Sequence, residues 1–399
     1  MIYRHEFQPY LLFMCLLFLT VSVFAEIPRA VFPKPVQPEI RLSDRWDLLV
    51  VKFQENTDVR LRSGRLTAPA YVDIAPVRTV LARYPGTRVE RLFSRPEAEY
   101  DRERHMGEQQ SGRELADLNL YFAVRPVSRD AAKGLLLELN ALGIVEGVYP
   151  EPLAQLPTHY LPVKPIPIRD SVKAHTGRPP PSFVDDQDYL EASPVGVNAY
   201  AAWSYPGGRG GAVKCIDVEA AWNWDHIDLP DYFYLAGNPW TGIYEDHGTA
   251  VLGEICSQDN EFGTTGIAPQ TAPGAVAIDY DDYPDSLAAW FDLASNRLDL
   301  GDVWLIELQG DGPADEPVAM EYWQANFDAI AASTALGRIC VEAAGNGGQD
   351  LDDPIYEGRF DRSVRDSGAI IVAAGTPYDM IPEDFTNYGS RIDANGWGS

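Results

Sequence analysis

The chain has 399 residues, of which 45% are hydrophobic and 23% are charged. This length predicts two or three compact units, and the apolar content excludes a wholly disordered chain. Acidic residues number 59 against 32 basic ones, a formal net charge of −27, which argues against a protein that binds nucleic acid or anionic lipid. The charge is uneven, because residues 1–181 carry a net +3 and residues 182–399 a net −30.

The first 25 residues have the pattern of a secretory signal peptide. Arg4 and His5 precede an apolar run over residues 10–24, and Val23 and Ala25 occupy positions −3 and −1 of a cleavage site. A signal anchor is the alternative, but the run is shorter than the 18 or more apolar residues expected of a span. We therefore predict removal of residues 1–25, a secreted or periplasmic protein, and no membrane attachment afterwards.

Three cysteines, Cys215, Cys256 and Cys340, follow the signal, so at most one disulfide can form within the chain. Cys215 and Cys340 lie in apolar, strand-like runs, which favours a role as small buried hydrophobes.

The segment that follows the signal predicts a proline-rich leader and then a small α+β unit. Residues 26–44 form the leader, and residues 45–156 form a strand–helix–strand–strand–helix–strand unit of the split βαβ, ferredoxin-like kind. Residues 96–112 are interpreted as a charged insertion or loop. The clearest elements are strands at 47–53, 118–124 and 145–156, and helices at 77–84 and 133–142, the second capped near Ser128 and stopped at Gly143.

A proline-rich linker over residues 157–181 separates this unit from residues 182–399. Short apolar strands then alternate with helical stretches, which predicts a parallel α/β sheet with helices on both faces. The expected elements lie at 212–216, 247–256, 274–278, 303–308, 319–336, 339–344 and 369–374.

Three polar clusters stand where strands of this sheet are expected to end. Asp217 ends the run Val213-Lys214-Cys215-Ile216, the sequence Asp246-His247-Gly248-Thr249 opens a helix, and Gly345-Asn346-Gly347 follows an apolar strand. In open α/β sheets, sites lie outside the carboxyl ends of the strands. The order and combination of these clusters over residues 182–399 resemble the subtilisin-like serine peptidases, and the preceding α+β unit resembles their inhibitory propeptide.

The resemblance implies Asp217 as the triad acid, His247 as the general base and Asn346 as the oxyanion-hole side chain. An imidazole titrates near neutrality and is held in one tautomer by a carboxylate. Each residue also has a simpler explanation: a helix N-cap for Asp217, a structural histidine for His247 and a turn asparagine for Asn346. Leu308, Gln309 and Gly310 are predicted to bind substrate.

The sequence departs from the family pattern in two places near these residues. Val218-Glu219 replaces the small hydroxyl residue and glycine that usually follow the triad acid, and Ala250 replaces the second histidine of the base motif. The Gly-Thr-Ser motif that carries the nucleophile in the family does not occur, and Ser390 and Ser399 lack its context. We therefore expect a chain truncated before its catalytic serine.

The leading hypothesis is a secreted serine endopeptidase precursor that acts on peptide or protein substrates and binds its own propeptide. The alternative is a catalytically inactive homologue with a binding or regulatory role. A metalloenzyme that uses His226, Asp228 and His247 is a weaker hypothesis, because no His-x-x-x-His pair occurs.

No cofactor is predicted to be required. The acidic loops at 279–285 and 349–353 could bind Ca²⁺, and a solvated acidic surface is the alternative explanation for them. The resemblance further implies that residues 148–153 lie in the substrate cleft. The opposite net charges of the two halves are expected to favour their docking.

Overall fold

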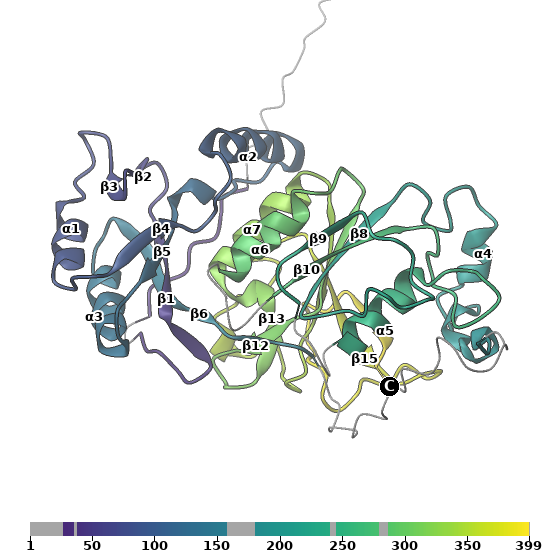
Figure 1. Cartoon of the computed structure of the whole chain (residues 1–399). Helices are drawn as coiled ribbons and strands as arrows, with labels where there is room; N and C mark the ends of the chain where they lie inside the picture. Colours follow the sequence, from purple (N-terminus) through teal and green to yellow (C-terminus); the bar gives the residue numbers. More distant parts are fainter. Residues whose placement is uncertain (1–26, 36–37, 158–179, 240–244, 279–285, 399) are drawn as a thin grey trace, which may run out of the picture.

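The computed structural model describes residues 27–35, 38–157, 180–239, 245–278 and 286–398, which form two units in contact (Figure 1). The predicted signal peptide, most of the linker and the acidic loop at 279–285 lie outside these residues.

The first unit comprises residues 27–157. Its elements are β1 (Asp44–Phe53), β2 (Arg60–Arg62), β3 (Arg65–Thr67), α1 (Ala75–Ala82), β4 (Arg88–Arg91), α2 (Glu97–Ser111), β5 (Tyr121–Arg125), α3 (Arg129–Asn140), β6 (Val145–Pro152) and β7 (Ala154–Gln155).

The first unit is built on a four-stranded antiparallel sheet in the order β4-β5-β1-β6. Alternate side chains of β1 point to opposite faces. Leu49 and Val51 pack with α1 and α3, whereas Leu48 and Val50 join the core shared with the second unit. Both faces of β1 are therefore covered, which explains its continuous apolar run.

Two helices of this unit differ in how well the local sequence predicted them. Ser128 caps α3 by accepting a hydrogen bond from the Ala131 N–H at 3.2 Å, as the capping pattern predicted. The expectation of a loop at 96–112 was wrong, because residues 97–111 form α2, which ends at Gly112 with a left-handed φ of 67°. Most of α2 is polar, and Arg104 and Glu108 pair along its surface at 3.0 Å.

The second unit, residues 180–398, contains a seven-stranded parallel sheet in the order β16-β15-β14-β11-β8-β10-β9, with helices packed against it. The predicted parallel α/β architecture is confirmed. Its elements are α4 (Ala199–Trp203), β8 (Lys214–Glu219), β9 (Tyr234–Ala236), α5 (Glu245–Cys256), β10 (Ala272–Ala277), α6 (Leu287–Ser295), β11 (Val303–Ile306), β12 (Gln309–Asp311), β13 (Pro317–Ala319), α7 (Gln324–Ala335), β14 (Ile339–Ala343), β15 (Ile370–Gly375) and β16 (Ala394–Trp397).

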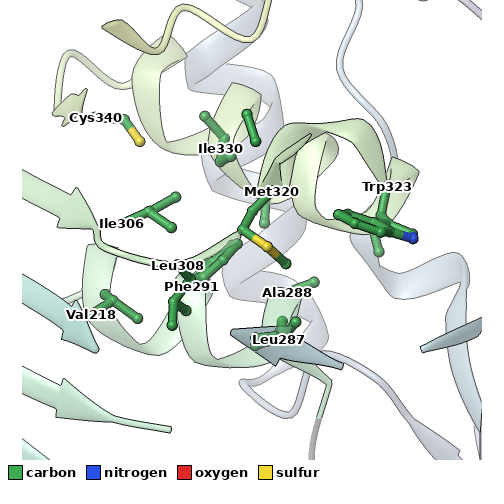
Figure 2. Close-up of a cluster of buried hydrophobic side chains, with 14 of the residues drawn as sticks. Val218, Leu287, Ala288, Phe291, Ile306, Leu308, Met320, Trp323, Ile330 and Cys340 are labelled. Atoms are coloured by element: carbon green, nitrogen blue, oxygen red, sulfur yellow. The ribbon is translucent and has the colours of Figure 1, made fainter. Parts of the chain in front are cut away.

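The main core lies between this sheet and helices α6 and α7. Figure 2 shows Val218 and Ile306 of the sheet facing Phe291 of α6 and Ile330 of α7, with Met320 between them. Cys340 is buried in the same cluster, and Cys215 and Cys256 are also buried and free. The prediction that Cys215 and Cys340 act as buried hydrophobes is confirmed. Among the residues that the structure describes, no helix is long and apolar enough to cross a bilayer.

Arginines of the first unit reach acidic and carbonyl groups of the second. Arg95 pairs with Asp292 at 2.8 Å, and Arg113 pairs with Asp366 at 3.1 Å. Arg41 donates to the Asp311 carbonyl oxygen at 2.7 Å. Helix α2 packs against α7, so polar contacts surround an apolar contact between the units. The basic side chains of the first unit and the acidic side chains of the second thus meet at the contact.

Glu151 makes the contact between the units dependent on pH. This residue of β6 is buried, its Oε1 accepts the Leu287 N–H at the start of α6 at 2.7 Å, and burial raises its pKa to about 7. A raised pKa means that the folded state favours the protonated acid. The resulting stability is fully present below the ordinary glutamate pKa and is lost as pH rises through about 7.

We expect the Glu151→Gln variant to lack this pH dependence. As pH rises from roughly 4 to 8, the free energy of unfolding of the wild-type chain should fall by about 3 kcal/mol more than that of Glu151→Gln. Denaturant titrations at several pH values measure the difference, and Glu39→Gln, at an exposed position of the same unit, serves as the control. Parallel stability profiles for Glu151→Gln and wild type would contradict the prediction.

Candidate active site

The candidate site lies at the carboxyl end of β8, the strand between β10 and β11. Asp217 and Glu219 are two residues apart on this strand, so the pleat directs both side chains to the same face. Both side chains are fully buried. Glu219 is the last residue of the strand, and Asp217 lies two residues further inside the sheet.

Glu219, not Asp217, contacts the histidine. The Glu219 Oε1 and His247 Nδ1 atoms are 2.7 Å apart, whereas Asp217 Oδ2 accepts the Trp222 indole N–H at 2.8 Å. The sequence predicted that Asp217 would orient His247, and the structure instead places Asp217 behind Glu219. The reason is the strand length: β8 continues for two residues past Asp217, so Glu219 reaches the edge of the sheet where α5 begins.

His247 is held at this edge by the close approach of α5 to the loop after β8. Its side chain is 18% exposed, which leaves one side of the ring open to solvent or a ligand. Gly248, the next residue, lies so close to the loop that an added Cβ would be 2.4 Å from the Ala221 carbonyl oxygen and 2.7 Å from the Trp222 indole. Thr249 adds a contact, because its Oγ1 accepts the Asn223 N–H at 2.8 Å.

The Gly248→Ala variant is therefore expected to push the start of α5 away from β8. Overpacking of this kind costs about 1–3 kcal/mol of unfolding free energy. Gly253→Ala in the same helix is the matched control, since nothing lies within 4 Å of its added Cβ, and it should be neutral or stabilise by about 0.5–1 kcal/mol. Chemical denaturation of both variants measures the difference, and equal stabilities would refute the packing argument.

Other carboxyl groups surround the Glu219–His247 pair. Glu307 follows β11 directly, and its backbone N–H donates to the Val218 carbonyl oxygen at 3.2 Å. Burial, with the nearby Asp217 carboxyl, raises the pKa of Glu307 to about 7. Burial also raises the pKa of Glu254 on α5. The environment of His247 is thus rich in carboxyl groups.

Asn346 lies after β14 and is fixed by two hydrogen bonds. Its backbone N–H donates to Gln309 Oε1 at 2.7 Å, and its side-chain Nδ2 donates to the Pro157 carbonyl oxygen at 2.8 Å. Gly345, with φ of 91°, turns the chain before it. The predicted Asn346 side chain therefore faces a main-chain carbonyl group of the first unit.

Asn387 supports the Asn346 loop, a role that the sequence did not predict. Its buried amide donates to the Ala344 and Pro317 carbonyl oxygens, each at 2.8 Å, and accepts the Gln349 N–H at 2.8 Å. The only hint in the sequence was the run Phe385-Thr386-Asn387-Tyr388, which resembles the family, and it gave no indication of these contacts.

The end of the first unit lies along a strand of the second. Strand β7 pairs antiparallel with β12, so that Gln155 lies opposite Gln309 and Ala154 opposite Gly310. Gln309 Nε2 also donates to the Leu156 carbonyl oxygen at 3.2 Å. Of the predicted substrate-binding residues, Gln309 and Gly310 thus contact a peptide segment, whereas the Leu308 side chain is buried in the core.

This segment lies later in the chain than the sequence predicted. Residues 148–152 belong to β6 in the sheet of the first unit, and the residues that run along β12 to Asn346 are 154–157. The predicted strand at 145–156 is in fact two strands in different sheets, so only the second, β7, reaches β12.

The residues of the metalloenzyme hypothesis are not brought together. His226 is exposed, and Asp228 accepts the Thr264 N–H at 2.8 Å and the Asn260 amide at 3.0 Å, which fixes a loop. Within the described ranges no group of three or more potential ligands surrounds a common point. In the acidic loop at 349–353, Asp352 accepts hydrogen bonds from Ser390 and Asp353 caps a short turn.

Comparison with solved structures gives the class of fold. Fervidolysin from Fervidobacterium pennivorans, a keratinolytic enzyme related to subtilisin, matches 93% of this chain and 50% of its own with 16% identity and a TM-score of 0.51. The subtilisin-like protease Apa1 from Pseudoalteromonas sp. AS-11 matches 50% of this chain and 44% of its own, with 20% identity and a TM-score of 0.39.

The epidermin leader peptide processing protease from Staphylococcus aureus matches 88% of this chain and 74% of its own, with 13% identity and a TM-score of 0.48. The chain thus spans about half the length of fervidolysin and of Apa1. No protein-family model and no curated relative matches the sequence. The likeness to fervidolysin shows that the chain has a subtilisin-like fold, as the sequence resemblance predicted.

Proposed function

We propose that the second unit is the catalytic domain of a secreted serine endopeptidase of the subtilisin type and that the first unit is its propeptide. His247 acts as the general base, Glu219 orients its ring, and Asn346 with a backbone N–H binds the oxyanion of the tetrahedral intermediate. The nucleophilic serine lies outside residues 1–399. In the described part of the chain, no serine hydroxyl is hydrogen bonded to the His247 ring.

The observation that carries this proposal is the position of residues 154–157. Ala154 and Gln155 form β7, which pairs with β12, and Pro157 just beyond it has its carbonyl oxygen 2.8 Å from Asn346 Nδ2. A peptidase holds the carbonyl group of the scissile bond at its oxyanion donors, and extended pairing is a common way to bind a peptide. The segment is therefore arranged like the acyl side of a bound substrate, with the peptide bond after Pro157 as the processing point.

The chemistry follows from the geometry. The Glu219 carboxylate binds Nδ1–H of His247, which leaves Nε2 free to accept the proton of a serine hydroxyl. The same imidazole then protonates the leaving amine. The Asn346 amide stabilises the negative charge on the former carbonyl oxygen. In subtilisin itself, the reference case, removal of the corresponding donor raises the activation barrier by about 2.7–4 kcal/mol. No cofactor takes part in these steps.

A second function is a catalytically inactive homologue that binds or regulates a partner. The replacement of the usual aspartate by Glu219 and the absence of a serine hydroxyl bonded to His247 in the described residues favour this alternative. In that case the strand β12 would bind an extended peptide without cleaving it.

Two measurements separate the functions. The reading frame beyond codon 399 should continue into a Gly-Thr-Ser motif if the protein is a peptidase, whereas a natural stop codon would exclude the endopeptidase. If the frame continues, the whole protein should react with a fluorophosphonate probe of serine nucleophiles, and mass spectrometry should find a new terminus at Thr158. Absence of labelling in the folded, processed protein would favour the binding function.

A further inference from the structure

Asp217 and Glu219 form a buried carboxyl pair with an incomplete set of hydrogen bonds. One oxygen of each group has a donor: Trp222 donates to Asp217 Oδ2, and His247 Nδ1 contacts Glu219 Oε1. The other oxygens, Asp217 Oδ1 and Glu219 Oε2, are buried and have no hydrogen-bond donor among the described residues. The two side chains lie on the same face of β8, within reach of each other.

Two ionised carboxylates cannot occupy this position at low cost. Each buried charge must be desolvated, and the two unmatched oxygens would repel each other. No lysine or arginine of the described residues forms an ion pair with either group. A single proton between the two oxygens removes one charge and supplies the missing hydrogen bond.

We propose that Asp217 is held as a carboxylic acid whose O–H donates to Glu219, so that Glu219 bears the one negative charge that faces His247. Asp217 is then a positioning residue, since it acts on the histidine through Glu219. The catalytic meaning of this arrangement rests on the proposed peptidase function, but the protonated pair itself does not.

The surroundings favour protonation of Asp217 rather than of Glu219. Glu219 lies beside the imidazole, which becomes cationic when it accepts a proton, whereas Asp217 meets only the neutral Trp222 indole. Burial raises the pKa of both carboxyl groups above their usual range, but the Glu219 charge raises that of Asp217 further, whereas the hydrogen bond from Asp217 lowers that of Glu219. The other titratable groups around the pair are the carboxyl groups of Glu307 and Glu254 and the thiols of Cys215 and Cys256, and none of them supplies a positive charge.

With Asp217 protonated, every polar atom of the pair is satisfied. Glu219 accepts one hydrogen bond from Asp217 and one from His247 Nδ1–H, which fixes its carboxylate plane and the tautomer of the ring. Ionisation of Asp217 would remove the donor to Glu219 and add a second negative charge behind it. Without that donor, the Glu219 carboxylate plane and the ring that it orients would be less firmly fixed.

Infrared spectroscopy and NMR on the folded chain test this inference without any assay of hydrolysis. At about pH 7, wild-type protein should show the carbonyl stretch of a protonated, buried carboxylic acid. Selective ¹³C labelling of aspartate, but not of glutamate, should shift this band, which assigns it without a mutation. Asp217→Asn should remove the band, and the control Asp259→Asn, at an exposed position, should retain it.

¹⁵N NMR of the His247 ring gives an independent result. Asp217→Asn preserves a neutral donor to Glu219, so the ring should keep the Nδ1–H tautomer of wild type, whereas Glu219→Gln removes the carboxylate that binds Nδ1–H and should convert part of the ring to the Nε2–H tautomer. Absence of the aspartate-labelled band, or an equal change of tautomer in both variants, would overturn the inference. If the whole protein with its nucleophile shows the band and does not hydrolyse peptides, the proposed function alone is refuted.

Discussion

His247→Ala is expected to abolish peptide hydrolysis in the form of the protein that contains the nucleophile, while the chain still folds. The imidazole is the proposed group that takes the serine proton, and loss of the histidine in subtilisin itself lowers kcat by roughly 10⁶-fold. Folding should survive because the His247 side chain is partly exposed and, among the described residues, its ring is hydrogen bonded to Glu219 alone. The substitution leaves the Glu219 carboxylate without that donor, which should cost about 1–3 kcal/mol.

The control for this prediction is His226→Ala. His226 is exposed and lies in the loop after β8, so its removal should leave hydrolysis unchanged. Initial rates on a peptide substrate, together with circular dichroism, separate a catalytic from a folding defect. Cleavage by His247→Ala at the wild-type rate would defeat the assignment of the general base.

The candidate site shows where sequence patterns are informative and where they fail. The alternation of apolar strands and helical stretches predicted the parallel sheet, and the clusters at residues 217, 247 and 346 predicted the edge at which its polar residues meet. The sequence pattern does not distinguish a strand that ends at Asp217 from one that ends at Glu219, because both residues are acidic and their side chains point to the same face of the strand. The contact between Glu219 and His247 depends on the exact strand end, which is the least predictable part of an element.

The error at α2 has a different physical cause. Its sequence lacks an apolar period, and only Tyr100 and Gly107 are buried, so periodicity could not identify it. The helix is held instead by tertiary contacts, such as the hydrogen bond from the Tyr100 hydroxyl to Asp292 at 2.7 Å, and by ion pairs along its surface. Contacts between residues nearly 200 positions apart leave no local signal in a single sequence. The support of Asn346 by Asn387 and Gln309 was missed for the same reason.

Arg391→Met is expected to cause the largest loss of stability among the substitutions considered. Arg391 and Glu321 form a fully buried ion pair with distances of 2.7 and 3.0 Å. Arg391 also donates to the Ala369 carbonyl oxygen at 3.1 Å, and Ser367 Oγ donates to Glu321 at 2.5 Å. The pair therefore joins the segment before α7 to the segment before β16, and the bonds to Ala369 and from Ser367 connect both to the segment before β15. Removing the guanidinium would leave the Glu321 charge buried and unpaired, a loss of about 3–5 kcal/mol.

The neighbouring carboxyl group makes this loss larger rather than smaller. Glu342 of β14 accepts the Glu321 N–H at 2.7 Å, and burial with the adjacent Glu321 charge raises the pKa of Glu342 to about 8. Without Arg391, two buried carboxyl groups would face each other, and the neighbouring Arg365 guanidinium donates to the Glu321 main-chain carbonyl oxygen rather than to its carboxylate. Because Glu342 lies four residues before Asn346 on the same strand and turn, disorder here would also reach the oxyanion donor.

A double-mutant cycle separates the pair from its surroundings. The variant Glu321→Gln combined with Arg391→Met should recover a large part of the stability lost by Arg391→Met alone, because no unpaired charge remains at position 321. Arg362→Met is the matched control, since Arg362 pairs with Asp393 from a half-exposed position and its loss should cost at most about 1 kcal/mol. Denaturant unfolding of wild type, of each single variant, of the double variant and of the control measures these differences. If Arg391→Met lost no more than Arg362→Met, the buried pair would not be what holds β14 and β15 to α7.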